Sequence, residues 1–160
     1  MGKRVLVAMS GGVDSSVAAW LLKKTGSDLI GAMMNLYEGV SPDKQGCCTL
    51  ADAKDARLVA ELLDIPFFMF NFTGHFKKDV IARFVDAYLD GATPNPCIDC
   101  NRYLKFERFL RRAQELDCTH IATGHYARIE FSGGRHLLRT GLDPSKDQSY
   151  ALYTMTQDQL

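Results

Sequence analysis

The sequence lacks an excess of charge of either sign, because 19 Lys and Arg residues balance 19 Asp and Glu residues. Without a net positive charge, the protein as a whole does not attract nucleic acid, so any contact with nucleic acid must be made by a local basic patch. No apolar run approaches the roughly 18 residues that span a bilayer, and Met1–Arg4 leads directly into an apolar segment. We therefore expect no signal peptide, no membrane partner and a cytoplasmic location.

The sequence also lacks the cysteine pattern of a disulfide-stabilised protein. Five cysteines, an odd number, argue against a disulfide scaffold in a cytoplasmic chain and favour reactive, metal-binding or core roles. The sequence shows no internal repeat, and its 160 residues suit one domain of ordinary globular composition. Residues 150–160 resemble the opening of a helix with no stop signal. We therefore expect the chain to be part of a longer protein.

The densest motif is Ser10–Ser16, Ser-Gly-Gly-Val-Asp-Ser-Ser, which follows the apolar run Val5–Met9. A strand, a tight turn and a helix starting at Val13 are predicted. Backbone N–H groups and the positive end of the helix dipole then face the turn, which is typical of a phosphate site. The motif lacks the lysine of a Walker A loop and is not GxGxxG. The alternative is a turn whose glycines serve packing alone.

The rest of the chain alternates apolar runs with helical patterns. Strands are predicted at 28–36, 66–72 and 119–123, helices at 50–63, 75–89 and 101–116, and a β-hairpin at 126–142, with a loop at 39–48 that includes Cys47 and Cys48. Thr49 and Asp52 predict a capping box at the start of the helix at 50–63. The apolar stripes expected on the first three helices are Val13, Val17, Ala18, Leu21 and Leu22; Ala53, Ala56, Val59, Ala60 and Leu63; and Phe76, Val80, Phe84, Val85 and Leu89. This alternation predicts an α/β fold, a doubly wound and mostly parallel sheet with helices on both faces. Ligands bind at the carboxyl ends of such strands, where Ser10–Ser16, Met34 with Asn35, and Gly124 with His125 are expected.

A second chemical centre is expected at Thr93–Asn101, a Pro-rich loop that carries Cys97 and Cys100. If a helix starts near Asn101, its dipole stabilises a thiolate at Cys100. A metal or iron–sulfur pair, a redox pair, and a nucleophile with a supporting cysteine all remain open.

A basic stripe is predicted on the helix that follows. Its members are Arg102, Lys105, Arg108, Arg111 and Arg112. Contact with RNA phosphates and a plain solvated face are equally good interpretations. Lys146, Asp147 and Gln148, taken alone, are ordinary turn residues.

Four motifs in this order resemble the tRNA-specific 2-thiouridylases, the MnmA family. They are SGGVDSS at Ser10–Ser16, TPNP-x-x-x-CN-x-x-x-KF at Thr93–Phe106, ATGHYARI at Ala122–Ile129 and KDQSY at Lys146–Tyr150. The resemblance covers the chain end to end. It implies that residues 1–160 form an N-terminal ATP-pyrophosphatase (PP-loop) catalytic domain, with central and β-barrel domains absent from this chain.

The resemblance also implies the reaction and its residues. ATP, with Mg²⁺, would adenylate the 2-oxygen of the wobble uridine of tRNA, and sulfur delivered by a donor protein, a cysteine desulfurase or relay, would displace AMP. ATP would be held by Ala8, Met9, Ser10, Gly11, Gly12, Val13, Asp14, Ser15, Met34 and Gly124. tRNA would be contacted by Asn95, Pro96, Cys97, His125, Lys146, Asp147 and Gln148.

Cys100 would be the nucleophile, and a second catalytic cysteine would follow residue 160. Many family members have Asp where this chain has Cys97, so a catalytic Cys97, or a three-cysteine [4Fe–4S] site on Cys97, Cys100 and the cysteine beyond residue 160, is an alternative sulfur route. Other functions stay open: another adenylating ligase such as an amidotransferase synthetase, or a nucleotide-binding module without turnover.

Overall fold

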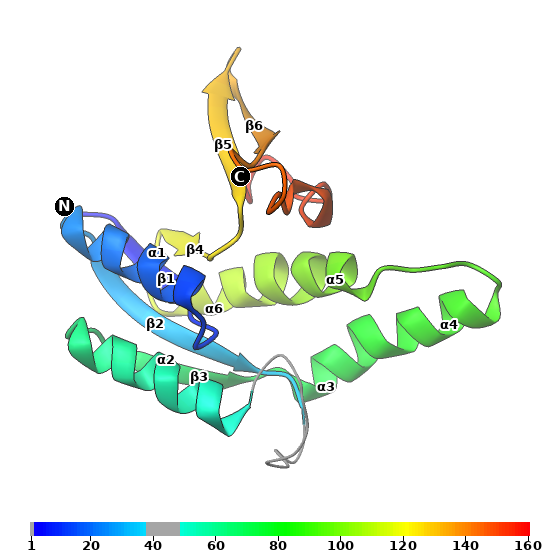
Figure 1. Cartoon of the computed structure of the whole chain (residues 1–160), viewed down its shortest axis with the longest axis horizontal. Coiled ribbons are helices and arrows are strands. Elements are labelled where there is room, and N and C mark those ends of the chain that lie inside the picture. Colours follow the sequence, from blue (N-terminus) through cyan, green and yellow to red (C-terminus); the bar gives the residue numbers. More distant parts are fainter. Residues whose placement is uncertain (1, 38–48) are drawn as a thin grey trace. The chain divides into compact units, whose positions relative to one another are not determined.

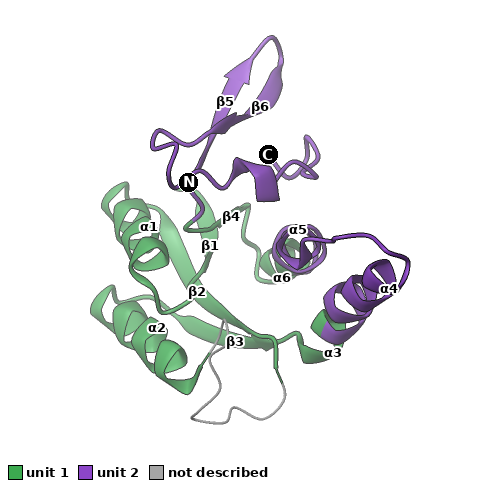
Figure 2. Cartoon of the chain, turned by 45° about the vertical axis from the view of Figure 1, so that its right-hand side comes forward, with its two compact units in different colours: residues 1–76, 109–124 green, residues 77–108, 125–160 purple. Residues whose placement is uncertain are grey.

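The computed structural model describes residues 2–37 and 49–160 of the chain. These residues form two compact units, shown in Figure 2: unit 1 comprises the described residues within 1–76 and 109–124, and unit 2 comprises residues 77–108 and 125–160. The predicted loop at 39–48, with Cys47 and Cys48, lies outside the described residues. The assignment of residues 1–160 to one catalytic domain stays a prediction.

Unit 1 is built on a four-stranded sheet in the order β3-β2-β1-β4 (Figure 1). Its strands are β1 Arg4–Ala8, β2 Asp28–Asn35, β3 Phe67–Asn71 and β4 His120–Ala122. All three pairings are parallel. Since β2 is central, its residues from Leu29 to Met33 are buried, as expected for a strand covered on both faces.

Helices cover both faces of this sheet, which confirms the predicted doubly wound fold. Helices α1 Val13–Lys24 and α2 Leu50–Leu62 lie on one face and α6 Phe109–Glu115 on the other, while the short α3 Thr73–Phe76 follows β3 (Figure 2).

Among residues 2–37 and 49–160, no helix is both long enough and apolar enough to cross a bilayer.

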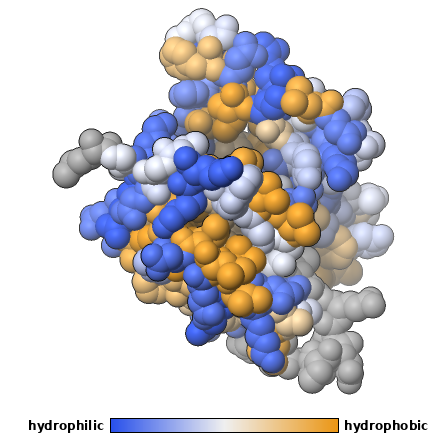
Figure 3. All heavy atoms as spheres, turned by 60° about the vertical axis from the view of Figure 1, so that its left-hand side comes forward, coloured by the Kyte–Doolittle hydropathy of each residue, from blue (hydrophilic) through white to orange (hydrophobic). Residues whose placement is uncertain are grey.

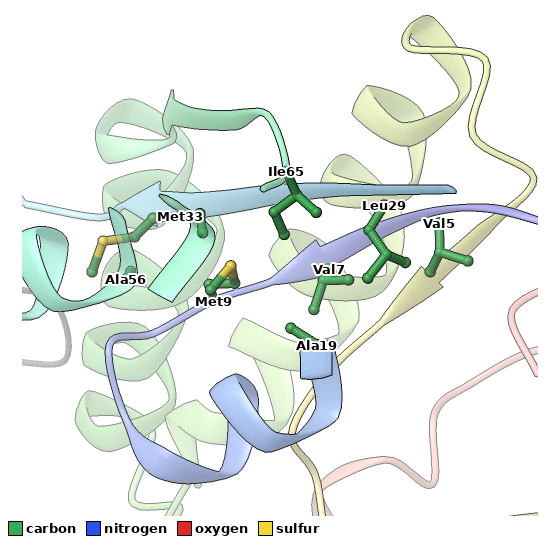
Figure 4. Packing of buried hydrophobic residues seen from close by; sticks show 9 residues of the cluster. Val5, Val7, Met9, Ala19, Leu29, Met33, Ala56 and Ile65 are labelled. Carbon is green, nitrogen blue, oxygen red and sulfur yellow. The ribbon is translucent and has the colours of Figure 1, made fainter. Parts of the chain in front are cut away.

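The core between the sheet and helices α1 and α2 is apolar (Figure 4). It consists of Val5, Val7, Met9, Ala19, Leu29, Met33, Ala56, Ala60 and Ile65. The helices contribute alanines, whose small side chains let helix backbones approach the strands closely. Of the predicted apolar stripe of α1, Leu22 packs against this core, whereas Val13, Val17 and Leu21 are 75%, 45% and 52% exposed. Helix α1 is therefore predicted correctly, but only part of its predicted stripe is buried.

Helix α2 begins with a capping box. The Asp52 N–H donates to Thr49 Oγ1 at 3.1 Å, and the Thr49 N–H donates to Asp52 Oδ2 at 2.7 Å. These hydrogen bonds lower the pKa of Asp52 below its ordinary value. The box expected from the sequence is confirmed, with Asp in place of the commoner Glu.

Unit 2 contains helical segments and a β-hairpin. The helical segments are the π-helix η1 Lys77–Ala82, α4 Arg83–Leu89, α5 Pro96–Asp99, the π-helix η2 Cys100–Arg108 and the 3₁₀ turn η3 Ser149–Ala151. Strands β5 Ala127–Ser132 and β6 Arg135–Thr140 pair antiparallel, which confirms the predicted hairpin. Gly133 and Gly134, with φ of 60° and 78°, form its two-residue turn, which needs positive φ at both positions.

The π-helix η1 explains why part of the apolar stripe predicted for the helix at 75–89 is exposed. Phe76 and Val80 are buried as expected, but Val85 and Leu89 are 46% and 81% exposed. A π turn contains more residues than an α turn, so positions after Lys77–Ala82 leave the face that the earlier apolar residues define.

Candidate functional site: a phosphate cradle and a cysteine helix

The Ser10–Ser16 loop is organised by the Ser15 hydroxyl, whose residue is only 4% exposed. The Ser10 N–H donates to Ser15 Oγ at 3.1 Å, and Ser15 Oγ donates to the Gly12 carbonyl at 3.1 Å. Ser10 Oγ lies 3.2 Å from Ser15 Oγ. The loop thus holds its shape through its own hydrogen bonds, as a preformed cradle would.

Helix α1 opens at this loop without a side-chain cap. Its N-cap is Gly12, which has no side chain to accept from the first-turn N–H groups. Such groups, with the helix dipole behind them, favour an anion. The predicted strand, turn and helix are confirmed, and Asp14 lies in the first turn of α1.

Gly11 brings a second helix to the cradle. Its φ of +82° is left-handed, and a Cβ at this position would lie 2.4 Å from the Asp52 carbonyl oxygen. The backbone of Gly11 therefore packs directly on the first turn of α2. Only glycine satisfies both conditions without displacing that turn.

The parallel register aligns the other predicted carboxyl-end residues with the loop. Ala8 pairs with Ala32 of β2, and Val7 pairs with Ala122 of β4. Met34 and Gly124 each lie two residues beyond these partners, on the same edge of the sheet. A Cβ on Gly124 would lie 2.8 Å from the Ser15 nitrogen. The structure of unit 1 thus brings Gly124 against the cradle, as the predicted strand ends required.

An apolar groove between α1 and α2 was not expected from the sequence. Figure 3 brings this side of the molecule forward and shows hydrophobic atoms gathered on it. The groove has a volume of about 580 Å³ and is lined by Gly11, Val13, Ser16, Val17, Trp20, Asp55, Leu58 and Val59. One indication of this groove was present in the sequence: α1 carries more apolar residues than are needed to form a single buried face.

The helix that carries the cysteines starts earlier than expected. Asn95 is the N-cap, with its Oδ1 accepting from the Cys97 N–H at 3.0 Å, and Pro96 occupies the first turn. The prediction that Cys100 stands just before a helix beginning near Asn101 is therefore wrong. Pro96 suits a first turn because its missing N–H has no partner there anyway. Cys97, not Cys100, occupies the N-terminal turn.

The two cysteines differ in exposure. Cys97 is exposed and Cys100 is partly buried, at the junction of α5 and the π-helix η2. Single π turns inside helices are frequent at functional sites. Residue pairs at i and i+3 share a helix face, which places Cys97 and Cys100 on the same side of the helix.

His125 in unit 2 is a neutral histidine. Burial lowers its pKa to about 4, and the nearby Lys105 cation acts in the same direction. Lys105 Nζ lies 3.4 Å from His125 Nε2. A neutral ring offers a hydrogen bond to a substrate but no cation for a phosphate.

Lys146, Asp147 and Gln148 support the base of the hairpin. Asp147 Oδ1 accepts from the Gly141 N–H at 2.6 Å, and these and neighbouring hydrogen bonds lower the pKa of Asp147. Gln148 Oε1 accepts from the Tyr126 N–H at 3.1 Å, and Lys146 Nζ lies 5.4 Å from the centre of the Tyr126 ring. Their predicted contact with tRNA stays a prediction.

Several members of the predicted basic stripe have partners within the protein. Arg108 pairs with Asp79 at 3.1 Å, and Arg112 pairs with Glu115. Arg102 and Arg83 both lie over the ring of Tyr103, at 5.1 Å and 4.6 Å from its centre. The charges of Arg108 and Arg112 are thus balanced locally, which favours the plain structural interpretation for these two.

The described residues do not complete an iron–sulfur site. Between residues 2 and 37 and from 49 onward, no group of three or more His, Cys, Asp or Glu side chains could hold a metal ion. Cys97 and Cys100 alone supply two ligands, whereas a [4Fe–4S] cluster needs three or four. Asp14 is a single carboxylate, which suits Mg²⁺ held mainly by phosphate oxygens.

The sheet, the cradle and the uncapped helix define the class of protein: an α/β domain of the PP-loop type. Within that class, the chain belongs to the family described as the tRNA methyl transferase HUP domain, whose model matches residues 3–160. The resemblance to the tRNA-specific 2-thiouridylases is confirmed as well.

The chain is similar to two proteins named as 2-thiouridylases and, more distantly, to one solved structure. The chain is 55% identical over 163 residues to a protein named tRNA-specific 2-thiouridylase MnmA from Clostridium beijerinckii, covering 100% of the chain and 46% of the relative. It is 54% identical over 161 residues to the protein of the same name from Clostridium botulinum strain Alaska E43, covering 99% and 45%. A predicted tRNA methyltransferase subunit from Methanocaldococcus jannaschii matches 90% of the chain and 60% of its own, with 19% identity and a TM-score of 0.49, which is too distant to bear on function. The chain spans about half the length of the curated relatives it matches.

Proposed function

We propose that this chain activates ATP in the 2-thiolation of a wobble uridine of tRNA. AMP is transferred to the uridine 2-oxygen and pyrophosphate leaves; sulfur then attacks C2 and AMP departs with the former uridine oxygen. The observation that carries the proposal is the identity of 55% with a named 2-thiouridylase over 100% of the chain. This range includes the phosphate cradle and the cysteine helix, which are the two parts that the reaction requires.

The cradle supplies the first half of the reaction. The loop from Ala8 to Ser15 and the first turn of α1 would hold the outgoing pyrophosphate, because their N–H groups and dipole favour an anion. Mg²⁺, when bound, would neutralise the phosphates beside the Asp14 carboxylate. Met34 and Gly124, on the same sheet edge, would flank the adenylate. A uridine oxygen is a poor leaving group until it carries AMP, which is why a pyrophosphate site suits this chemistry.

The cysteine helix supplies the second half. Cys100 would be the nucleophile, and the resemblance places the second catalytic cysteine, which would carry the persulfide that the donor protein supplies, after residue 160. The terminal persulfide sulfur would bond to C2 as AMP leaves, and the Cys100 thiolate would then attack the other sulfur, forming a disulfide between the two cysteines and releasing the 2-thiouridine. Cys97, exposed in the first turn, would lie by the target base with Asn95 and Pro96. An iron–sulfur route would need ligands that the described residues do not provide, and no step here depends on it.

The remaining predicted residues would contact tRNA. His125, whose pKa of about 4 keeps it neutral near pH 7, would donate or accept a hydrogen bond. Lys146, Asp147 and Gln148 would present the hairpin base to the RNA. Such a tRNA-modifying reaction is consistent with the expected cytoplasmic location.

The test measures pyrophosphate release and 2-thiouridine formation with ATP, Mg²⁺, tRNA and a sulfur donor, on this chain and on the chain extended to the length of its curated relatives. Cys100→Ser should abolish thiolation and retain ATP binding. Cys118→Ser, at a buried cysteine, is the matched control and should retain both. Thiolation that persists in Cys100→Ser, or an extended protein that releases no pyrophosphate with tRNA, contradicts the proposal.

A further inference from the structure

An aromatic ring in unit 2 gathers two arginines. The guanidinium carbon of Arg83 lies 4.6 Å, and that of Arg102 lies 5.1 Å, from the centre of the Tyr103 ring. Tyr103 is half-buried, whereas both arginines are exposed. Arg83 directly follows the π-helix η1, which packs against the π-helix η2 that carries Arg102 and Tyr103. We call these three residues the arginine–tyrosine cluster.

The two arginines of this cluster have no carboxylate within ion-pair distance in the described part of the chain. Asp86 and Asp99 each lie three residues from one of them along the sequence, but neither forms such a pair. At the other end of η2, by contrast, Arg108 pairs with Asp79 at 3.1 Å. A tyrosine ring attracts a cation without cancelling its charge. Two positive charges are therefore left without a counter-charge near the start of η2.

The cluster lies in the same helical turn as Cys100. The π-helix η2 begins at Cys100, and Arg102 and Tyr103 follow within its first turn. Under the proposed function, the target uridine must come to Cys100, and the RNA backbone brings its phosphates with it. Each of these phosphates carries a negative charge. The arginines thus stand where the reaction itself delivers an anion.

Stacking on the ring leaves the guanidinium N–H donors available, because they lie at the edge of the planar group. A phosphate accepts from such a fork through two of its oxygens. The ring also restricts both long side chains before the ligand arrives, so less conformational entropy is lost on binding. We infer that the arginine–tyrosine cluster is a clamp for a backbone phosphate beside the target uridine, an inference that rests on the proposed function.

The test measures the salt dependence of tRNA binding, because each contact with a single-strand phosphate contributes about 0.7 to the slope of log affinity against log salt. Dissociation constants of a tRNA transcript are measured between about 50 and 200 mM salt, on the protein extended to the length of its curated relatives. The variants are Arg83→Gln and Arg102→Gln, singly and together, with Tyr103→Leu and Tyr103→Phe. Arg112→Gln is the matched control, since Arg112 belongs to the same predicted stripe but pairs with Glu115.

The double arginine variant should bind tRNA about tenfold more weakly at the lowest salt concentration, and its slope should be flatter by about 0.7. Either single substitution should show part of both losses. Tyr103→Leu retains both charges, so it should keep the slope but lose about threefold in affinity. Tyr103→Phe keeps the ring and should match the unaltered protein, as should Arg112→Gln. Both arginines are exposed, so the variants should fold, which far-UV circular dichroism checks.

An unchanged slope in the double variant overturns the inference. So does an equal flattening in Arg112→Gln, which would show a diffuse effect of the whole stripe. A double variant that keeps its tRNA affinity but loses thiolation with the donor protein would show that the arginines contact an acidic partner protein, and also overturns it. If the unaltered extended protein binds no tRNA, the proposed function fails together with this inference, whereas variants that all behave like the unaltered protein overturn the inference alone.

Discussion

Substituting Gly11 with alanine should destabilise unit 1 more than the same change at another glycine of similar φ. Gly11 has φ of +82°, and its Cβ would lie 2.4 Å from the Asp52 carbonyl oxygen and 2.7 Å from the Asp52 Cα. A left-handed conformation costs a residue other than glycine roughly 1–2 kcal/mol. Forcing extra volume into a closely packed contact typically costs about 1–3 kcal/mol more. We therefore expect Gly11→Ala to lower the free energy of unfolding by about 2–5 kcal/mol.

Gly26 provides the matched control. Its φ is +77°, but a Cβ there meets nothing within 4 Å. Gly26→Ala should therefore show the conformational cost alone, about 1–2 kcal/mol. In a chain of this size about 2–4 °C of melting temperature corresponds to 1 kcal/mol.

The assay is thermal unfolding followed by far-UV circular dichroism, with both variants compared with the unaltered chain. Gly11→Ala should melt clearly below Gly26→Ala. Equal melting temperatures in the two variants would refute the reasoning, because they would mean that the contact with the first turn of α2 costs nothing to disturb.

Three further predictions concern single contacts. The pKa of His125 is lowered from 6.5 to about 4, so the unfolded state binds a proton that the folded state does not, and stability should fall as the pH drops from 6.5 toward 4; melting curves over this range should show the loss, by up to about 3 kcal/mol, and His125→Gln should remove it. Thr49→Ala breaks the capping box and should cost about 1 kcal/mol in urea unfolding; because the pKa of Asp52 is lowered, the contribution of its carboxylate is present above about pH 4 and is lost in acid, whereas the hydrogen bond from the Asp52 N–H to Thr49 Oγ1 does not titrate, so the cost should shrink in acid without vanishing, and a cost that grows in acid argues against the box. Asn101 is 3% exposed, with Nδ2 donating to the Ala151 carbonyl at 3.2 Å and Oδ1 buried without a hydrogen-bond partner among the described residues; Asn101→Ala should cost about 1–3 kcal/mol, Asn101→Leu less because it refills the space without a buried amide, and equal losses in urea unfolding would contradict this.

The sequence was a good guide wherever a local rule decides the structure. Two glycines after an apolar run predicted the turn before α1, and Thr49 with Asp52 predicted the cap of α2. Asn95 followed by Pro96 carried an equally local signal for the start of α5, which the expected break at the prolines obscured.

The sequence was a good guide to the buried side of α2, whose predicted stripe packs on the core, but a poor guide to that of α1. Periodicity marks Val13, Val17, Ala18, Leu21 and Leu22 as one stripe of α1. Of these Leu22 packs against the core, but the residue that the sheet covers completely is Ala19, at 0% exposure. The π turn at Lys77–Ala82 likewise changes the phase of the helix after it. Both outcomes depend on packing against distant segments, which a repeat of 3.6 residues does not encode.

The sequence by itself determined the alternation of strands and helices, the phosphate-binding turn and the family, because these follow from short-range steric rules and from motif spacing. Only the tertiary structure showed that Gly11 packs on the first turn of α2 and Gly124 on the backbone of Ser15. Those contacts join residues that are far apart along the chain and arise from strand register. Register is a property of the assembled sheet, since each parallel strand finds its partner only when the intervening helix has packed against it.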